Sequence, residues 1–317
     1  MTSEIDLVIV TPVYEDRIAS ARLFQELAAL DIDSLKVVAV DDGSVNEPLD
    51  PNCLRNAGLE GHVITLKRNV GHQRAIAIGL SFVEAEIKTA GSIIVMDSDG
   101  EDLPASIEPL LQVLEGSTTD VVVAGRRSRI ETLRFRAFYI VYKFLFRVLV
   151  GRNISFGNFM AIKAKALKRL VVLPELWIHV ASCVLMSKLR MTVTQLDRGP
   201  RYAGQSKMNF VGLALHGFRG FMVFAEDVLV RVGIACSIVA FFAIVGATAA
   251  VILKILSFAT PGWFSVALGI LFMVFLQTGT LTLMTLMLTG VVRSTTISKP
   301  NYSDFIETVH TGNIVSS

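Results

Sequence analysis

Apolar residues in the first part of the chain fall into short continuous runs, each of which ends at polar or turn-forming residues. Five of these runs are rich in β-branched residues and predict buried strands, within residues 5–15, 35–44, 62–72, 91–102 and 119–129. The segments between them repeat apolar residues at helical spacing, in residues 17–30, 73–87 and 103–115. Strands that alternate with helices and are apolar along their whole length predict an α/β domain with a mostly parallel sheet.

Two much longer apolar runs follow further along the chain. Of the 317 residues, 52% are hydrophobic, which is too many for an ordinary soluble domain. No charged residue lies between Arg231 and Lys254, or between Lys254 and Arg293. Because about 20 apolar residues suffice for one crossing, we expect transmembrane helices at 232–254 and 263–292. The alternative is a pair of buried core helices, but the runs are longer than such helices usually are.

Two amphipathic segments precede these long runs. Residues 133–150 place basic residues among aromatic and aliphatic ones at helical spacing. This pattern is typical of a helix that lies on a membrane with anionic lipid, or of a core helix whose basic side chains reach the solvent. Residues 208–231 form the second segment and predict a juxtamembrane helix that leads into the first span.

Basic residues gather at the outer ends of the two apolar runs. Four of them flank these ends: Arg219, Arg231, Arg293 and Lys299. The turn between the runs carries only Lys254 at its edge, so the positive-inside rule places both termini in the cytoplasm. The chain opens on an acidic stretch that leads into a strand, and not on a signal peptide. We therefore expect a multi-pass membrane protein, of the inner membrane in a bacterium, with a cytosolic domain at 1–207 and a cytosolic tail at 293–317.

Cysteine usage and net charge restrict the other possibilities. Cys53, Cys183 and Cys236 show no paired spacing, which fits a reducing compartment and argues against a disulfide framework or a zinc site. The net charge of +2 is small, and we expect no nucleic-acid partner.

The candidate chemistry lies where the predicted strands end, because ligands bind at the carboxyl ends of the strands in parallel sheets. The stretch DSDGED, residues 97–102, follows an apolar strand, and its four carboxylates repel one another unless a cation lies among them. Asp97, Asp99 and Glu101 offer the hard oxygen ligands that Mg²⁺ or Mn²⁺ takes together with the phosphates of a nucleotide. A solvated acidic turn is the alternative interpretation.

Two further polar segments also follow predicted strands. Asp41 and Asp42 are suited to accept hydrogen bonds from a base or a ribose, and Gly43 allows close approach of the backbone, although a turn or helix cap explains the same residues. The segment TPVYE, residues 11–15, is suited to frame a base and a ribose. His72 and His179 are more simply explained as packing residues than as ligand contacts.

The order of these segments carries a resemblance. VIVTPVYE, VVAVDDGS, RNVGHQRAIAIGL and IIVMDSDGEDLP resemble glycosyltransferase family 2, which has the Rossmann-like GT-A fold. GRRSRIET, SFGNFMAI and RGPRYAGQSKMNF, with two spans after them, are similar to the polyprenyl-phosphate glycosyltransferases, the group of dolichyl-phosphate mannose synthase and the bactoprenol glucosyltransferases. The resemblance covers about residues 5–292. It implies a GT-A catalytic domain, juxtamembrane amphipathic helices and a two-helix transmembrane hairpin.

The resemblance also implies an activity. A sugar would pass, with inversion, from a nucleotide-diphosphate sugar to a polyprenyl phosphate at the cytoplasmic face of the membrane. A UDP-sugar is the first expectation for the donor, and a GDP-sugar stays open. The resemblance further implies a metal-dependent hexosyltransferase that uses Mg²⁺ or Mn²⁺ and forms a homo-oligomer, such as a tetramer.

The resemblance assigns roles to individual residues. The nucleotide pocket would be formed by Thr11, Pro12, Tyr14 and Glu15, with Asp41 at the base and Asp42 at the base or ribose. The metal and the diphosphate would be faced by Asp97 and Asp99, with Glu101 as a further metal ligand. The acceptor phosphate or the donor diphosphate would lie near Arg126, Arg127 and Arg129. The segment that closes over the site would contain Arg201, Gln205, Ser206 and Lys207.

One residue departs from the pattern of the family. Many relatives have Asp-Phe where this chain has Asn158-Phe159, and that Asp has been considered a catalytic base. Asn cannot take the proton, but a lipid monophosphate has its second pKa near 6 and is largely dianionic at neutral pH. Such a nucleophile needs placement and charge screening more than deprotonation. Asn158 therefore stays a catalytic candidate that hydrogen-bonds the acceptor or the sugar, and a helix cap or a changed sugar preference is the alternative.

Two other functions stay open. A processive polysaccharide synthase usually has more spans and a Gln-x-x-Arg-Trp segment, whereas neither Trp177 nor Trp263 follows an arginine. A non-catalytic membrane subunit that binds a sugar nucleotide in a glycosylation or flipping complex is supported by Asn158. The acidic and arginine clusters argue against it.

Overall fold

The computed structural model describes residues 5–30, 32, 34–87, 90–126, 133–154, 156–203, 210–258, 262–294 and 300–312. The chain forms two compact units. The first comprises Met1–Tyr139, Ile154–Val223 and Ser298–Ser317, and the second comprises Ile140–Asn153 and Phe224–Ile297. The first unit contains the α/β fold, and the second contains the long apolar helices.

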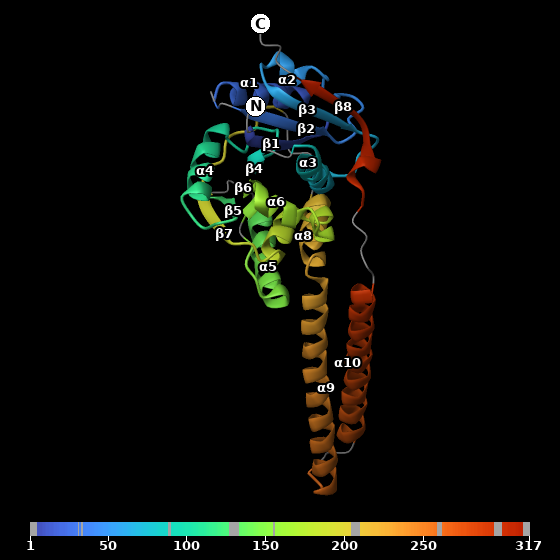
Figure 1. Ribbon diagram of the computed structural model, residues 1–317. Coiled ribbons are helices and arrows are strands. Elements are labelled where there is room, and N and C mark those ends of the chain that lie inside the picture. The colour runs from blue at the N-terminus through green and yellow to red at the C-terminus, as the bar shows by residue number, and fades with distance from the viewer. Residues whose placement is uncertain are drawn as a thin grey trace. The chain divides into compact units, whose positions relative to one another are not determined.

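The first unit is built on a sheet in which eight described strands have the order β7-β5-β6-β4-β1-β2-β3-β8 (Figure 1). Five strands coincide with the predicted apolar runs: β1 (Ile5–Val13), β2 (Leu35–Asp41), β3 (Glu60–Leu66), β4 (Ala90–Val95) and β5 (Val121–Arg126). β1 pairs in parallel with β2 and with β4, and β2 pairs in parallel with β3. The predicted α/β fold with a mostly parallel sheet is therefore confirmed.

Three strands have no counterpart in the sequence prediction. They are β6 (Phe156–Lys163), β7 (Met191–Leu196) and β8 (Ile306–Gly312). β6 runs antiparallel between β4 and β5, and β7 pairs in parallel with β5. Because β6 runs against β4, its first residues lie at the edge of the sheet where β4 ends.

The strand β8 comes from the far end of the chain and pairs antiparallel with β3 (Figure 1). Its approach is held by η3 (Tyr302–Phe305), where the amide of Lys67 donates to the carbonyl of Phe305 at 3.0 Å. The ring of Phe305 also packs on Trp177, with 5.7 Å between the centroids. Segments that precede and follow the long apolar helices therefore share one sheet.

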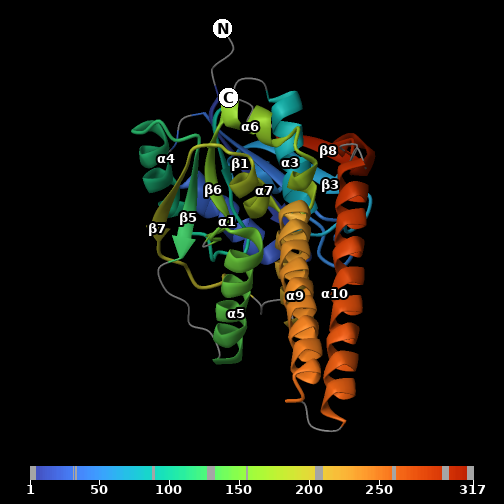
Figure 2. The same cartoon turned by 90° about the horizontal axis from the view of Figure 1, so that it is seen from below.

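Helices cover both faces of this sheet. One group contains α1 (Arg17–Ala28), α2 (Cys53–Asn56), η1 (Pro104–Ser106) and α4 (Ile107–Glu115). The other contains α3 (His72–Glu86), α6 (Ala164–Leu170), η2 (Pro174–Trp177) and α7 (Val180–Met186), and the last three each contact α3. Figure 2 shows α3, α6 and α7 together. The apolar faces of α1 and α4 pack against strand residues such as Ile9 and Val37. This three-layer packing holds the strand ends in fixed positions.

The remaining helices are α5 (Leu133–Val150), α8 (Phe210–Met222), α9 (Ala225–Ile255) and α10 (Trp263–Ser294). Both α9 and α10 are long and apolar enough to cross a membrane, as predicted, and they lie side by side (Figures 1 and 2). The segment 208–231 was predicted as one helix, but α8 ends at Met222 and α9 begins at Ala225. Phe224 leaves the helical conformation at this break, and its ring packs edge-on against Phe146 at 5.8 Å.

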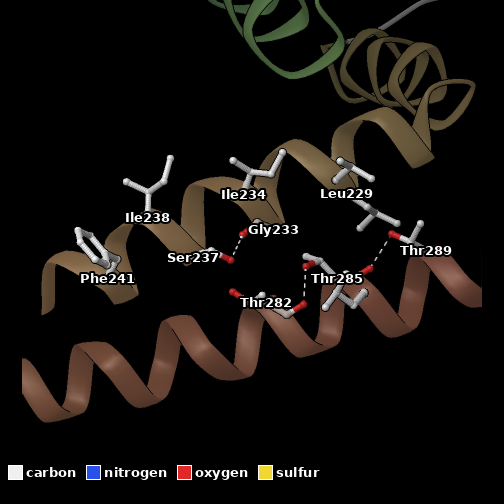
Figure 3. A pocket seen from close by; sticks show the side chains of 11 residues that line it. Leu229, Gly233, Ile234, Ser237, Ile238, Phe241, Thr282, Thr285 and Thr289 are labelled. Atoms are coloured by element: carbon white, nitrogen blue, oxygen red, sulfur yellow. Dashed lines mark hydrogen bonds between the residues drawn. The ribbon is translucent and has the colours of Figure 1, made fainter. Parts of the chain in front are cut away.

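An apolar groove of about 420 Å³ lies between α9 and α10 (Figure 3). Several of its lining residues carry hydroxyl groups. Ser237, Thr282 and Thr289 each donate to the backbone carbonyl four residues earlier in the same helix, at 2.7–2.9 Å. These hydroxyl groups are therefore satisfied within the helices themselves.

Candidate functional site

The candidate residues gather at one edge of the sheet, where β1, β2 and β4 end. The chain passes from β1 to β2 and β3 on one side and returns to β4 on the other, so the strand order reverses beside β1. Ligands of open α/β sheets bind at such a switch point. Thr11 and Pro12 are buried within β1, and Tyr14, which follows β1, is 44% exposed. Tyr14 is therefore an aromatic surface at the mouth of the site.

The carboxylate of Glu15 organises the loop that follows β2. It accepts hydrogen bonds from the backbone amides of Val45 and Glu47, both at 2.7 Å. In return, the hydroxyl of Ser44 accepts from the amide of Glu15 at 2.8 Å. Glu15 itself has a φ of 47°, in the left-handed region. Glu15 thus fixes the shape of this loop.

Asp41 and Asp42 are both buried and hold backbone amides. The two oxygens of Asp41 accept from the amides of Ser44 at 2.9 Å and Leu49 at 2.8 Å. The predicted contacts of both aspartates with a base or ribose remain predictions. A carboxylate has lone pairs for about four hydrogen bonds, so these contacts leave room for a ligand.

Asp42 joins the end of β2 to the beginning of α3. Its oxygens accept from the amides of Val70 at 2.7 Å and Gly71 at 2.9 Å. Burial raises the pKa of Asp42 to about 6, and the two amide hydrogen bonds counteract only part of this effect. Asp42 therefore fixes Gly71. The next residue, His72, is the first residue of α3.

The cations among the acidic residues 97–102 are side chains of the chain itself. Nη1 of Arg201 lies 2.9 Å from Oδ2 of Asp99 and 3.9 Å from Oε1 of Glu101. Arg198 forms an ion pair with the other oxygen of Glu101. Burial and the neighbouring Asp97 raise the pKa of Asp99, although both arginines act in the opposite direction. Arg198 is the first residue of the segment RGPRYAGQSKMNF, which carries the resemblance, but the resemblance assigned it no role.

Backbone hydrogen bonds hold the arginine-bearing segment against the acidic loop. The amide of Gly199 donates to the carbonyl of Glu101 at 3.0 Å, and that of Tyr202 donates to the carbonyl of Asp99 at 2.8 Å. The hydroxyl of Tyr202 donates to Glu26 on α1. Residues 198–202 therefore cover one side of the acidic loop.

His72 and Asn158 lie on another side of this loop. Nε2 of His72 is 3.2 Å from Oδ1 of Asp97 and 3.1 Å from Nδ2 of Asn158. The desolvation of His72 lowers its pKa, but the carboxylates of Asp97, Asp102 and Asp99 outweigh this and leave the pKa raised. His72 was expected to pack rather than to contact the site, and the structure corrects this, because only the fold brings α3, β4 and β6 together.

Asn158 also lines a small polar cleft of about 20 Å³, roughly the space of one water molecule. Asp97 and Arg198 line the same cleft. Asn158 therefore has His72 on one side and a polar space on another.

His179 is buried, as expected for a packing residue. Its Nδ1 accepts from the amide of Ser182 at 3.1 Å, and its Nε2 lies 3.2 Å from Nε2 of His216. Burial lowers the pKa of His179 to about 3, so this side chain is neutral at physiological pH.

The acidic residues match a divalent cation in the kind of donor they offer. Asp97 and Asp99 are close enough for the charge of Asp97 to raise the pKa of Asp99. Within the described ranges, however, no group of three or more His, Cys, Asp or Glu side chains is arranged to hold a metal ion. Instead, Arg201 pairs with Asp99 and Glu101, and Arg198 pairs with Glu101.

Several predicted site residues lie outside the described residues: Arg127, Arg129, Gln205, Ser206 and Lys207. Arg126 is the last residue of β5, which ends at the same edge of the sheet as its parallel neighbour β7. The predicted roles of these residues remain predictions.

Comparison with solved structures and curated proteins agrees with this fold. Mannosyl-3-phosphoglycerate synthase from Rubrobacter xylanophilus has a TM-score of 0.51 at 17% identity, over 70% of this chain and 73% of that one. A glycosyltransferase of Synechocystis is 28% identical over 284 residues, which is 85% of each chain. Dodecaprenyl-phosphate galacturonate synthase from Rhizobium johnstonii is 26% identical over 138 residues, 42% of this chain and 39% of that protein.

The fold and the edge site define a GT-A glycosyltransferase domain. The model of glycosyl transferase family 2 matches residues 8–187, more than half of the chain, and the chain belongs to this family. The protein is therefore a glycosyltransferase that uses a sugar nucleotide.

Proposed function

We propose that this protein transfers a sugar, with inversion at the anomeric carbon, from a UDP-sugar or GDP-sugar to a polyprenyl phosphate. The products would be a polyprenyl-phosphate sugar and a nucleoside diphosphate. The reaction would take place at the cytoplasmic face of the membrane, because the acceptor lipid cannot leave the bilayer.

The observation that carries this proposal is the place of α9 and α10 within the chain. Both helices are long enough to cross a membrane, and they lie between α8 and β8, which belong to the same compact unit. A pair of spans whose two ends return to one unit has both ends at the same face of the membrane. The basic residues beside those ends support the cytoplasm as that face.

The helix α8 supports a position at the membrane surface. Four large apolar side chains on α8 are exposed: Val211, Leu215, Phe218 and Met222. Their spacing places them on one face of the helix, and α9 begins three residues after α8 ends. On α5, Ile140, Phe144 and Val148 are exposed in the same way. In this proposal both helices lie in the membrane interface.

The acceptor class is supported by a relative. The similarity to dodecaprenyl-phosphate galacturonate synthase covers 42% of this chain, and the name of that enzyme contains a polyprenyl phosphate. An acceptor of this kind agrees with a catalytic domain that is linked to two membrane-length helices.

In this proposal the donor nucleotide lies at the ends of β1 and β2. Tyr14 would stack on the base, and the loop shaped by Glu15 would frame the ribose. Asp41 and Asp42 would use their remaining lone pairs on the base and the ribose. The sugar diphosphate would then extend from the end of β2 toward the acidic loop that follows β4.

Asp97 and Asp99, with Glu101, would hold Mg²⁺ or Mn²⁺. When bound, this cation would supply positive charge to the diphosphate leaving group. The arginines of the 198–202 segment would add to that charge, since two phosphorylated substrates repel each other in a partly dry site. Arg126, Arg127 and Arg129 would serve the same purpose at the acceptor phosphate.

The transfer itself would need no protein base. An oxygen of the acceptor phosphate, a dianion at neutral pH, would form the new bond to the anomeric carbon. The bond from that carbon to the diphosphate oxygen would break, and its electron pair would leave with the diphosphate. Since the nucleophile carries no proton to be removed, Asn158 is compatible with this reaction.

The test is a release assay on the purified full chain in detergent micelles. The chain is incubated with Mn²⁺ or Mg²⁺, a short polyprenyl phosphate and a panel of sugar nucleotides, and nucleoside diphosphate is measured. Release that depends on both lipid and metal, from one favoured donor, is the expected result. Asp99→Asn should lose at least about 100-fold in rate. Asp120→Asn is the matched control, since Asp120 pairs with Arg190 before β5, at the opposite edge of the sheet. Bound nucleotide without any release would instead support a non-catalytic subunit.

A further inference from the structure

We propose that α10 associates with α10 of a second copy of the chain, and that Gln277 forms the polar centre of this contact. The partner is thus another molecule of the same protein, in the same orientation in the membrane. The inference takes the membrane-spanning position of α10 from the proposed function, but it does not depend on the transfer reaction.

Gln277 lies in the middle of the second membrane-length segment. This segment runs from Trp263 to Val291, so Gln277 is fourteen residues from each of its ends. At about 1.5 Å per residue, that is about 21 Å of helix on either side. The hydrocarbon core of a bilayer reaches only about 15 Å from its centre, so a glutamine side chain at this depth is too short to reach either interface.

The amide of Gln277 differs from the hydroxyl groups around it. The five threonines of the segment each donate to a backbone carbonyl of α10 itself, at 2.7–2.8 Å. Gln277 is the one residue between Trp263 and Val291 whose side chain carries an amide or a charge. It is exposed, and within the described part of the chain its side chain makes no hydrogen bond. Two N–H donors and a carbonyl oxygen therefore face hydrocarbon, which is costly unless another helix supplies partners.

Gln277 belongs to a continuous seam of exposed residues on α10. The members of this seam alternate at spacings of four and three: Val266, Ile270, Met273, Gln277, Thr280, Met284, Met287 and Val291. The average spacing of 3.5 residues is the repeat at which two helices stay in contact along their length. Most of α10 is apolar, so the amide is what selects this seam from the rest of the helix.

The seam is separate from the contact between α10 and α9. On α10, Leu271 lies 3.3 Å from the place of a Cβ on Gly246, and Oγ1 of Thr285 lies 3.0 Å from the place of a Cβ on Gly233. Neither Leu271 nor Thr285 is a member of the seam. The packing of α9 on α10 therefore leaves the seam uncovered, and a further helix is able to pack there without displacing α9.

The chemistry of the amide decides which partner fits the seam. Lipid tails and prenyl chains carry no hydrogen-bonding groups, so they cannot satisfy an amide at this depth. Another Gln277 can, because each amide donates with its NH₂ group and accepts with its oxygen. Two copies in one membrane have the same orientation, so their Gln277 side chains meet at the same depth. Amide side chains join membrane helices in this way, and identical seams related by a two-fold axis are self-complementary.

The first experiment measures association of the full chain in liposomes, by energy transfer between donor-labelled and acceptor-labelled molecules at falling protein-to-lipid ratios. Gln277→Leu should raise the dissociation constant by about threefold to thirtyfold. Gln277→Asn keeps the amide and should restore most of the loss. A wild-type chain that is monomeric at every ratio overturns the inference, and this is also the result expected if the amide serves a different membrane protein. Equal dissociation constants for the wild type and Gln277→Leu overturn it as well.

Cysteine cross-linking locates the contact on the helix. Met273 belongs to the seam, and Phe272 is its neighbour at nearly the same depth, with 60% exposure against 61% for Met273. In a chain whose three native cysteines are replaced by alanine, oxidation in the membrane should link Met273→Cys into dimers and link Phe272→Cys much less. Equal linkage at the two positions would show that the copies do not meet through the seam.

Parallel measurements separate this inference from the proposed function. Nucleoside diphosphate release is measured on the same liposomes. A chain that releases nucleoside diphosphate while monomeric overturns this inference alone. A chain that associates through the seam but releases nothing supports the inference and contradicts the proposed function. A chain that alkaline carbonate extracts from the liposomes does not span the membrane, and this result overturns both.

Discussion

Alanine at Gly43 tests how closely the loops at the edge of the sheet fit together. Gly43 has a φ of 69°, and a Cβ there would lie 2.5 Å from the carbonyl carbon of Arg68 and 2.7 Å from the amide nitrogen of Asn69. Both atoms belong to the backbone, and the next amide, that of Val70, is held by Asp42. The neighbours therefore cannot move away easily.

Gly58 provides a matched control for this substitution. Its φ is 77°, and a Cβ there would have nothing within 4 Å. An alanine residue in the left-handed region costs about 1 kcal/mol. The free energy of unfolding of Gly58→Ala should therefore be lower than that of the wild type by about 1 kcal/mol alone. Gly43→Ala adds the overlap with the Arg68–Asn69 backbone, which by analogy with overpacked cores costs about 1–3 kcal/mol more. We therefore expect the free energy of unfolding of Gly43→Ala to be lower than that of the wild type by about 2–4 kcal/mol in total.

The assay is urea unfolding of the full chain in detergent micelles, followed by the fluorescence of Trp177 in a Trp263→Phe background. Trp177 is buried against Phe305 and reports the first unit. Gly43→Ala should have a clearly lower urea midpoint than Gly58→Ala and should also release less nucleoside diphosphate. Equal midpoints for the two variants would refute the reasoning, because the conformational cost would then be the whole effect.

Three further predictions concern a buried acid, an arginine and a strand. Burial raises the pKa of Asp42 from 3.8 to about 6, so the folded chain binds this proton more tightly than the unfolded chain. The free energy of unfolding should therefore fall by about 2 kcal/mol as the pH rises from 4 to 6, and urea unfolding should show that Asp42→Asn lacks this part of the slope. Arg201→Gln should bind Mn²⁺ more tightly in a paramagnetic-resonance titration, because Arg201 occupies an oxygen of Asp99; weaker binding would contradict this. A chain that ends at Lys299 lacks β8 and should show a lower urea midpoint for Trp177 fluorescence, and an unchanged midpoint would contradict the role of β8 in the sheet.

The part of the fold that could be predicted is the part whose signal is local. The strands β1 to β5 are buried and nearly continuous in apolar residues, so each carries its own pattern. In contrast, β8 is exposed along most of its length, and its pairing with β3 joins residues far apart in sequence. Edge strands of this kind carry polar residues, so no apolar run marks them. At the break between α8 and α9, Phe224 packs on Phe146, a contact that the sequence does not reveal.

The candidate site shows the same division. The acidic loop could be located because it directly follows an apolar run at the end of β4. Two partners of that loop could not be identified, because Arg198 reaches it from the segment after β7 and His72 reaches it from α3. Their proximity depends on strand order, and strand order is not written in any single segment. The sequence thus predicts where charge accumulates, and the fold determines which groups compensate it.

The position of β8 has a consequence for the synthesis of the protein. The ribosome makes β3 early and β8 only after α9 and α10, so the edge of β3 stays without its partner while both apolar helices emerge. In the proposed topology, the translocon inserts the two helices during this interval. In that topology the sheet would be completed only when the chain returns to the cytoplasm after α10. Maturation of the catalytic domain would thereby be coupled to correct insertion, and a chain whose second span failed to return would not close its own sheet.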